Sequence, residues 1–296
     1  MGSDEADRDE NTRENRDSGV GDDTLYGGST IRTIETSRTA DSDVFNVVHE
    51  HGRTYHSYKA GRYLQPNDER EQRRECLWAI SMGKFGCLPS ILNQAPKNRR
   101  SHSCGIAAHQ FPGARIIGND LSPITPPRIP ANCQFEVDDV EEFPWIYSHK
   151  FDFIHARSIY ACFEDTQRVI IEAAAWLEDN GWLEVQDWLV PMRCDDGSWD
   201  GTAIKRLTET AVECFRKAGR CNHSEKLPDM FRKAGLVDVK EEVILWPMEL
   251  NKEALESATL ALLTRYGNFT KEEAMELITM ARVDLRDTKI HVYQPA

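Results

Sequence analysis

Four short segments in the middle of the chain, in a fixed order, constrain its fold most. They are GARIIGNDLSP (113–123), CQFEVDDVEEFPW (133–145), FDFIHAR (151–157) and LEDNGWLEVQDW (177–188). The first three are β-branched or aromatic runs that end on acidic or polar residues, and the last follows a helical pattern that we expect to stop at Asn180-Gly181. This alternation is typical of an α/β protein with an open parallel sheet, which binds its ligands beyond the carboxyl ends of the strands.

The charge of the chain argues against polyanionic partners. Its 296 residues carry a formal net charge of −13, so the field of the molecule repels phosphate backbones and anionic lipid headgroups. No apolar run approaches the roughly 20 residues of a membrane span, and the first residues lack the features of a signal peptide. We therefore expect neither direct nucleic-acid binding nor membrane association, and we expect a cytoplasmic or nuclear location.

The eight cysteines form no CxxC pair and no regular spacing, which predicts reduced thiols rather than a disulfide framework. Cys214, Cys221 and His223 lie close in sequence. Their spacing fits no common zinc pattern, so no metal site is predicted.

The chain is expected to form one globular domain, 44–296, after a disordered acidic tail, 1–43. The tail has almost no apolar residues whose burial could offset the entropy of ordering. A helix is expected to start near Pro66-Asn67-Asp68. Further helices are expected in 166–181 and 201–220, and the segment 227–248 is expected to form a helix, a glycine stop and a strand. Two more helices are expected in 252–287, the second starting with a Thr270–Glu273 capping box, and a closing strand is expected after 289.

Acidic residues end two of the expected strands. Asp120 can accept hydrogen bonds from a ribose diol, or it can be an exposed residue that opens the turn at Ser122-Pro123. Asp138 and Asp139 can contact an adenine amino group, or they can belong to a solvated charged loop. The segments thus predict a nucleoside-binding edge of the sheet.

Two further strand ends carry candidate groups. His155 can be a base above the ligand crevice or a structural histidine. Glu184, Gln186 and Asp187 interrupt an otherwise apolar strand, which indicates either a polar pocket or an edge position.

Several segments together resemble one protein family, the fungal LaeA-like methyltransferases. They are HGRTYHSYKAGRYLQPNDEREQ (51–72), GNDLSP (118–123), FDFIHAR, LEDNGWLEVQ, LALLTR (260–265) and LRDTKIHVY (285–293). This family is a branch of the class I S-adenosylmethionine-dependent fold that is associated with secondary metabolism. The resemblance implies a Rossmann-like parallel sheet with helices on both faces. It divides the domain into an amino-terminal lid (44–90), a cofactor-binding core (91–190) and a carboxyl-terminal, substrate-side part (191–296).

The resemblance also implies methyl transfer from S-adenosyl-L-methionine. Asp120 would hold the ribose, Asp138 and Asp139 would lie by the adenine, and Tyr58 and Tyr63 would belong to the lid over the cofactor. His56 and His155 are the candidate bases, although the aromatic residues of the lid could equally serve as packing. The acceptor would be a small molecule, for which an aromatic metabolite is suitable, or a protein, and velvet-type regulators would be the protein partners.

The sequence departs from the family where the first strand and its Gly-x-Gly-x-Gly turn should lie. In 91–112 only Gly105 remains of that turn, and the strand is replaced by cationic and imidazole side chains: Lys97, Arg99, Arg100 and His102. Either the gene model is wrong here, or the cofactor site has decayed. The main hypothesis is a methyltransferase, the rival is an impaired scaffold or regulator, and a different Rossmann-like protein is disfavoured because the signatures at both ends match.

Overall fold

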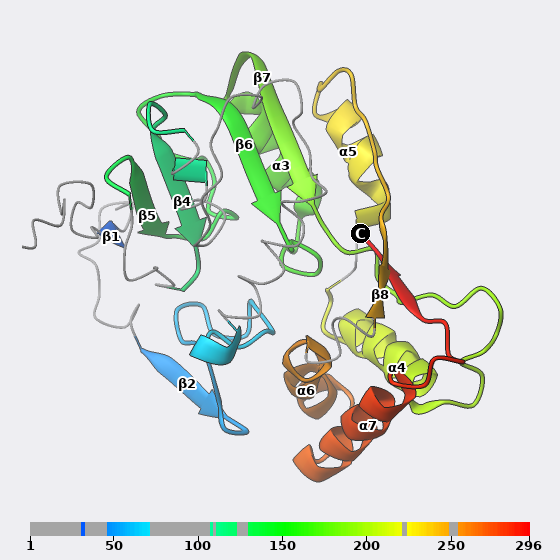
Figure 1. Ribbon diagram of the computed structural model, residues 1–296. Coiled ribbons are helices and arrows are strands. Elements are labelled where there is room, and N and C mark those ends of the chain that lie inside the picture. The colour runs from blue at the N-terminus through cyan, green and yellow to red at the C-terminus, as the bar shows by residue number, and fades with distance from the viewer. Residues whose placement is uncertain are drawn as a thin grey trace, which may run out of the picture.

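The computed structural model describes residues 46–71, 107–108, 111–122, 130–220, 224–248 and 254–296, and the backbone of 31–32. Its centre is parallel β-structure (Figure 1). β4 (Ile116–Asp120) pairs with β5 (Cys133–Val137), and β6 (Phe151–Arg157) pairs with β7 (Leu177–Gln186). The carboxyl ends of all four strands point toward α6 (Ala254–Tyr266) and toward the amino-terminal hairpin of β2 (Val47–Glu50) and β3 (Arg53–His56). The predicted α/β class is confirmed.

The sheet is described in two parts, with the order β1-β5-β4 in one and β6-β7 in the other. Within the described residues no strand joins β4 to β6, and residues 91–106, where the family's first strand is expected, lie outside that set. The two-residue strand β1 (Ile31–Arg32) adds to the edge of β5. It falls inside the tail for which disorder is expected, and the rest of 1–43 lies outside the described residues.

The predicted helix stop at Asn180-Gly181 is wrong. α3 (Thr166–Ala175) ends at its cap Trp176, and β7 begins one residue later. The pairing with β6 then shifts, and Asn180 (φ 66°) and Gly181 lie inside this irregular strand. A Cβ on Gly181 would come within 3.0 Å of the Glu178 and Phe151 carbonyl oxygens, so the glycine permits close strand packing rather than ending a helix.

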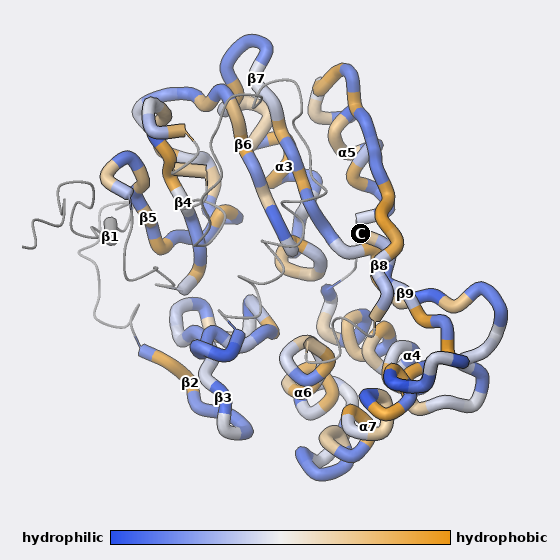
Figure 2. Tube along the Cα trace, viewed as in Figure 1, coloured by the Kyte–Doolittle hydropathy of each residue, from blue (hydrophilic) through white to orange (hydrophobic). Residues whose placement is uncertain are grey.

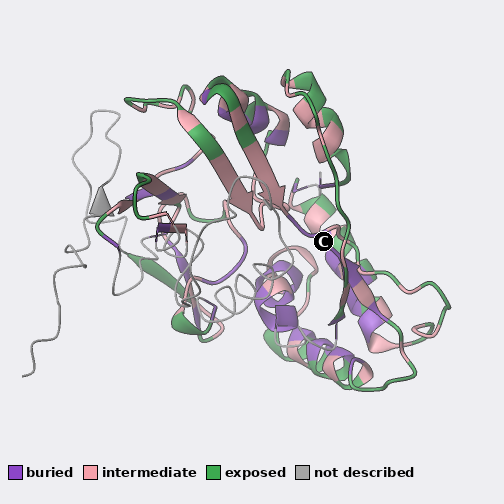
Figure 3. Cartoon of the chain, turned by 45° about the horizontal axis from the view of Figure 1, so that its top comes forward, coloured by how far each residue is buried: buried purple, intermediate pink, exposed green. Residues whose placement is uncertain are grey.

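The largest apolar core lies in the carboxyl-terminal helices α4 (Ala203–Lys217), α6 and α7 (Lys271–Asp284). Hydrophobic and hydrophilic positions alternate along them (Figure 2). Buried residues concentrate on these helices and α3, whereas β6 and β7 are mostly intermediate or exposed (Figure 3). The core therefore provides a rigid wall beside the carboxyl ends of the strands.

The other predicted elements of this region are also found. Thr270 and Glu273 form the expected capping box at the start of α7. α5 (Leu227–Lys233) follows the short 3₁₀ helix η2 (Ser224–Lys226) and precedes Gly235, whose φ is 86°. β8 (Leu245–Pro247) pairs antiparallel with the closing strand β9 (Tyr293–Pro295).

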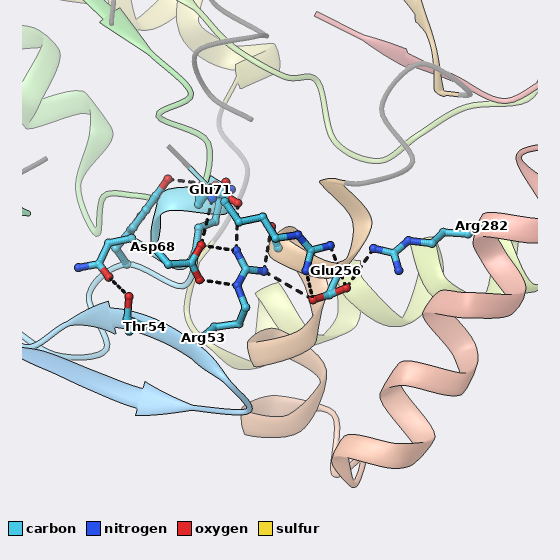
Figure 4. A network of polar contacts seen from close by, with 11 residues as sticks. Arg53, Thr54, Asp68, Glu71, Glu256 and Arg282 are labelled. Atoms are coloured by element: carbon cyan, nitrogen blue, oxygen red, sulfur yellow. Dashed lines mark hydrogen bonds and ion pairs between the residues drawn. The ribbon is translucent and has the colours of Figure 1, made fainter. Parts of the chain in front are cut away.

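The amino-terminal segment is a hairpin of β2 (Val47–Glu50) and β3 (Arg53–His56), followed by a helix start. Asp68 accepts a hydrogen bond from the Glu71 backbone N–H at 3.0 Å, so it caps a helix that starts where the sequence predicts one. Buried Arg53 donates to Asp68 at 2.9 Å and to Ser257 of α6 at 3.2 Å (Figure 4). A network of charges thus attaches this segment to the carboxyl-terminal helices.

Glu256 is the centre of that network on α6. It accepts hydrogen bonds from Arg70 at 2.8 Å and from Arg282 of α7 at 3.1 Å, and it lies 3.7 Å from Arg53 (Figure 4). Because one carboxylate serves three guanidinium groups from three parts of the chain, its position fixes how these parts meet.

In the part of the chain that the structure covers, no helix has the length and hydrophobicity that a bilayer crossing requires.

Candidate active site

Asp120 and Asp138 lie next to each other at the ends of adjacent parallel strands. The Asp138 backbone N–H donates to the Asp120 carbonyl oxygen at 3.1 Å, which continues the pairing of β4 with β5. Asp120 is exposed, and its Oδ1 accepts from the Ser122 N–H at 2.8 Å. Burial raises the pKa of Asp138, whose Oδ1 accepts from the Asp139 N–H. The strands therefore bring the two predicted carboxylates to one edge of the sheet.

Asp139 is held by the amino-terminal segment. Its Oδ2 accepts from Lys59 at 2.7 Å and its Oδ1 accepts from the Glu141 N–H at 2.9 Å. Lys59 also contacts Glu142, and Arg62 donates to Glu141 at 2.9 Å. Burial acts to lower the pKa of Lys59, but its bonds to Asp139 and Glu142 outweigh burial and raise it. A contact of Asp139 with a ligand would compete with this ion pair.

Tyr58 lies beside the same acidic loop. Burial raises the pKa of its phenol, and the negative charges of Glu142, Asp138 and Asp139 add to the increase while Lys59 opposes it. The amino-terminal segment therefore packs against the loop that follows β5, and its role as a lid stays a prediction.

His56 and Tyr63 lie together in the amino-terminal segment, with ring centroids 6.1 Å apart. His56 is buried, and its only hydrogen bond among the described residues is a weak one to the Lys59 backbone. Burial lowers its pKa, so the ring is neutral at pH 7. The Tyr63 hydroxyl donates to Gln65 Oε1 at 3.1 Å, and Gln65 in turn donates to the Tyr160 hydroxyl beyond β6. This chain of contacts links the lid to the β6 end of the sheet.

His155 belongs to a different group of side chains. It is paired in register with Glu184 of β7, it stacks on Phe153, and Gln186 hydrogen-bonds it. Burial and the nearby charge of Arg157 lower its pKa to about 4. An imidazole with that pKa is a weak base at neutral pH, so its catalytic role stays a prediction.

Asp187 joins the ends of β6 and β7. It is buried, and it accepts from the N–H groups of Tyr160 at 3.1 Å and Trp188 at 2.9 Å and from the Ser224 hydroxyl at 2.8 Å. Burial raises its pKa to about 6 although these bonds oppose the shift. Of the three polar residues noted in this segment, Asp187 shapes the loops at the site, while Gln186 donates to Glu184 within β7 at 2.7 Å.

The cations Lys59 and Arg62 of the amino-terminal segment and the polar residues Ser158 and Gln65 were not predicted as site residues from the sequence. The pair Lys59 and Arg62 faces the acidic run that starts at Asp138, and this charge complementarity was readable from the sequence. Ser158 and Gln65 carried no such signal. Gly105, Cys221 and His223 lie outside the described residues, and Cys214 is buried in the helical core, where burial raises the pKa of its thiol.

Parallel strands with neighbouring carboxylates at their carboxyl ends are typical of the class of Rossmann-like nucleotide-binding proteins. A family model described as a methyltransferase domain matches residues 102–241. Methyltransferase pytC of Aspergillus terreus is 32% identical over 292 residues, covering 88% of this chain and 89% of the relative. Protein-methionine methyltransferase laeA of Emericella nidulans is 26% identical over 280 residues, covering 84% and 74%. The chain belongs to the LaeA-like methyltransferases of fungi.

Among solved structures, a phosphoethanolamine N-methyltransferase of Haemonchus contortus in complex with S-adenosylhomocysteine matches with a TM-score of 0.41 and 14% identity. The match covers 79% of this chain, and this chain spans about half, 52%, of that protein.

Proposed function

We propose that the protein uses S-adenosyl-L-methionine to methylate an acceptor in fungal secondary metabolism or its regulation. The observation that carries this proposal is the placement of Asp120 and Asp138 at the carboxyl ends of adjacent parallel strands, joined by the 3.1 Å backbone hydrogen bond. Two carboxylates at this edge suit the hydroxyl and amino groups of an adenosine.

The described residues fit the adenosine half of the cofactor. Exposed Asp120 would accept hydrogen bonds from the ribose, and half-buried Asp138 would lie by the adenine. Asp139, bound by Lys59, would hold the cover formed by Tyr58 and its neighbours in place. When bound, the cofactor supplies an electrophilic methyl group: a lone pair of the acceptor bonds to the methyl carbon, the sulfur–carbon electron pair returns to sulfur, and the acceptor's proton passes to water.

His56 is the candidate for contact with a ligand on the lid side. A buried imidazole with a ring nitrogen that lacks a partner is costly, and a bound ligand would satisfy that nitrogen. Neutral at pH 7, it could donate a hydrogen bond or accept a proton. Tyr63, 6.1 Å away between ring centroids, would keep its ring in place.

The biological setting rests on the relatives. One is described as a protein-methionine methyltransferase and another as a methyltransferase, so either a protein or a small molecule can be the acceptor. The family resemblance supports velvet-type regulators as partners and a cytoplasmic or nuclear location.

Calorimetric titration with S-adenosylhomocysteine tests the proposal. We expect micromolar binding, and we expect Asp120→Ala to weaken it at least tenfold because a ribose contact is lost. Asp152→Ala, at an exposed position of β6, is the matched control and should bind normally.

The rival function is that of a scaffold that no longer binds the cofactor, and the observation that favours it is the loss of the glycine-rich turn in 91–112. A well-folded sample that shows no binding in this titration would favour the rival. Sequencing the transcript across residues 90–112 would then show whether the turn is truly missing.

A further inference from the structure

A cavity of about 90 Å³ lies between the carboxyl ends of β6 and β7 and the helices α4 and α6. Its wall includes Ser158 and Tyr160 after β6, Trp188 after β7, Phe215 of α4 and Gln65 of the amino-terminal segment. The carboxyl ends of β4 and β5, which form the proposed cofactor edge, point the same way as those of β6 and β7 (Figure 1). We therefore expect an acceptor to enter on the side of this cavity.

The described wall of this cavity carries no charged side chain. Two of its hydroxyls are turned back to their own helices: Thr208 donates to the Ile204 carbonyl at 2.8 Å and Thr259 donates to the Leu255 carbonyl at 2.5 Å. A phosphate, sulfonate or ammonium group inside would lose its water without gaining a counterion. The cavity therefore selects an uncharged occupant.

The wall includes the aromatic rings of Tyr160, Trp188 and Phe215. Tyr160 meets Phe215 edge to face, with centroids 6.2 Å apart, and Trp188 meets Trp246 in the same way at 6.4 Å. These ring pairs fix one another, so they present a preformed apolar surface. A ring of the occupant would fit such a surface with little reorganisation.

One polar group in the wall is left unsatisfied. The Ser158 hydroxyl is buried and has no hydrogen-bond partner, and the residue has a φ of 53°. Its backbone N–H is held by the Gln186 carbonyl at 3.0 Å, which fixes the residue at the end of β6. A buried hydroxyl without a partner, at a backbone conformation that non-glycine residues rarely adopt, costs stability, and a ligand would repay it.

We infer that this cavity binds the methyl acceptor, and that the acceptor is a neutral, ring-containing small molecule whose oxygen hydrogen-bonds to Ser158. The inference rests on the proposed methyltransferase function and adds the substrate class. A small, partly open pocket without charged side chains and with one unsatisfied hydroxyl in its wall suits a phenol-like group better than an ionic one.

A matched pair of probes tests the substrate class. 4-Methylphenol and 4-methylbenzenesulfonate share their ring and differ in charge, and their binding can be followed by ligand-observed NMR. We expect the phenol to bind at least tenfold more tightly than the sulfonate. Equal binding of both probes, or no binding of the phenol, would overturn the inference.

Two variants tie the binding to this cavity. Ser158→Ala should weaken phenol binding at least threefold while the melting temperature stays equal or rises, because an unsatisfied polar group is removed. Ala258→Leu, on the α6 wall, should block the phenol by filling the space. Thr210→Ala, which removes an exposed hydroxyl of α4, is the control and should leave binding unchanged. Unchanged phenol affinity in both Ser158→Ala and Ala258→Leu would exclude this cavity.

S-adenosylhomocysteine titrations of the same samples separate the two proposals. Normal cofactor binding together with no phenol binding would refute the cavity inference and leave the methyltransferase function standing, with a protein acceptor as the remaining class. Phenol binding without cofactor binding would refute the proposed function and support the cavity as a binding site of a different kind.

Discussion

Arg265, in the last turn of α6, binds Glu50 of β2 with its Nε 3.1 Å from Oε2, although 215 positions separate the two residues. Its guanidinium also lies 4.9 Å from the centroid of the buried Tyr55 ring. Beside it, Thr264 hydrogen-bonds His51 at 3.2 Å. The two signature segments from opposite ends of the chain are therefore parts of one interface.

Arg265→Gln should loosen this interface. The change removes both the ion pair and the cation–π contact, and we expect the free energy of unfolding to fall by about 2 kcal/mol. Hydrogen exchange of the amides in 47–56 should speed up more than that of α7. Arg216→Gln is the control: it removes an exposed ion pair with Glu213 on α4, and we expect no change in stability or exchange. Unaltered exchange in the hairpin would show that Arg265 does not hold it.

Glu256→Gln should destabilise the protein by about 3 kcal/mol, because three guanidinium groups lose their shared carboxylate in a largely buried place. Urea denaturation should show a lower midpoint at an unchanged slope. Glu213→Gln, whose carboxylate is exposed, should behave like the parent protein.

The loss of stability caused by Glu256→Gln should also depend on pH. Burial acts to raise the pKa of Glu256, but its bonds to Arg70 and Arg282 outweigh burial and lower it. A lowered folded-state pKa means that the stabilisation is present at neutral pH and is lost as the pH falls through that pKa. The difference between parent and variant should thus shrink in acid, and a constant difference down to pH 3 would contradict this account.

Asp187→Asn tests the raised pKa of a buried carboxyl. The folded-state pKa of about 6 exceeds the ordinary value of 3.8, so the stabilising contribution of this group is full below pH 4 and is lost as the pH rises through 6. The parent protein should therefore lose about 3 kcal/mol relative to the variant between pH 4 and pH 7. Thermal unfolding of both proteins across this pH range measures this difference in stability. If the stabilities of the parent and the variant change in parallel with pH, the raised pKa of Asp187 is disproved.

His155 should titrate far below ordinary histidines. Burial and Arg157 lower its pKa to about 4, whereas the bond to Asp196 raises the pKa of exposed His291. Proton NMR of the imidazole signals, assigned with His155→Gln and His291→Gln, should give one midpoint near 4 and one above 6.5. A His155 midpoint near 6.5 would restore it as a candidate base.

Local patterns were sufficient where a short run of sequence decides the structure. The apolar runs that end at Asp120 and Asp138 predicted two adjacent strands, and Thr270 with Glu273 predicted a helix start, because strand propensity and capping depend on neighbouring residues. The same kind of signal failed at Gly181. A glycine that ends a helix and one that permits close strand approach look alike in sequence, and only the neighbouring Phe151 carbonyl distinguishes them.

The sequence by itself determined the α/β class and the carboxylates at the strand ends, since these follow from periodicity, residue type and spacing along the chain, and the resemblance of its signature segments indicated the family. Only the tertiary structure decided that Asp139 is bound by Lys59, that Glu256 joins three arginines, and that Ser158 belongs to the wall of an uncharged cavity. The physical reason is that burial and pairing arise between segments as far apart as Glu50 and Arg265, whose meeting depends on how the whole chain packs.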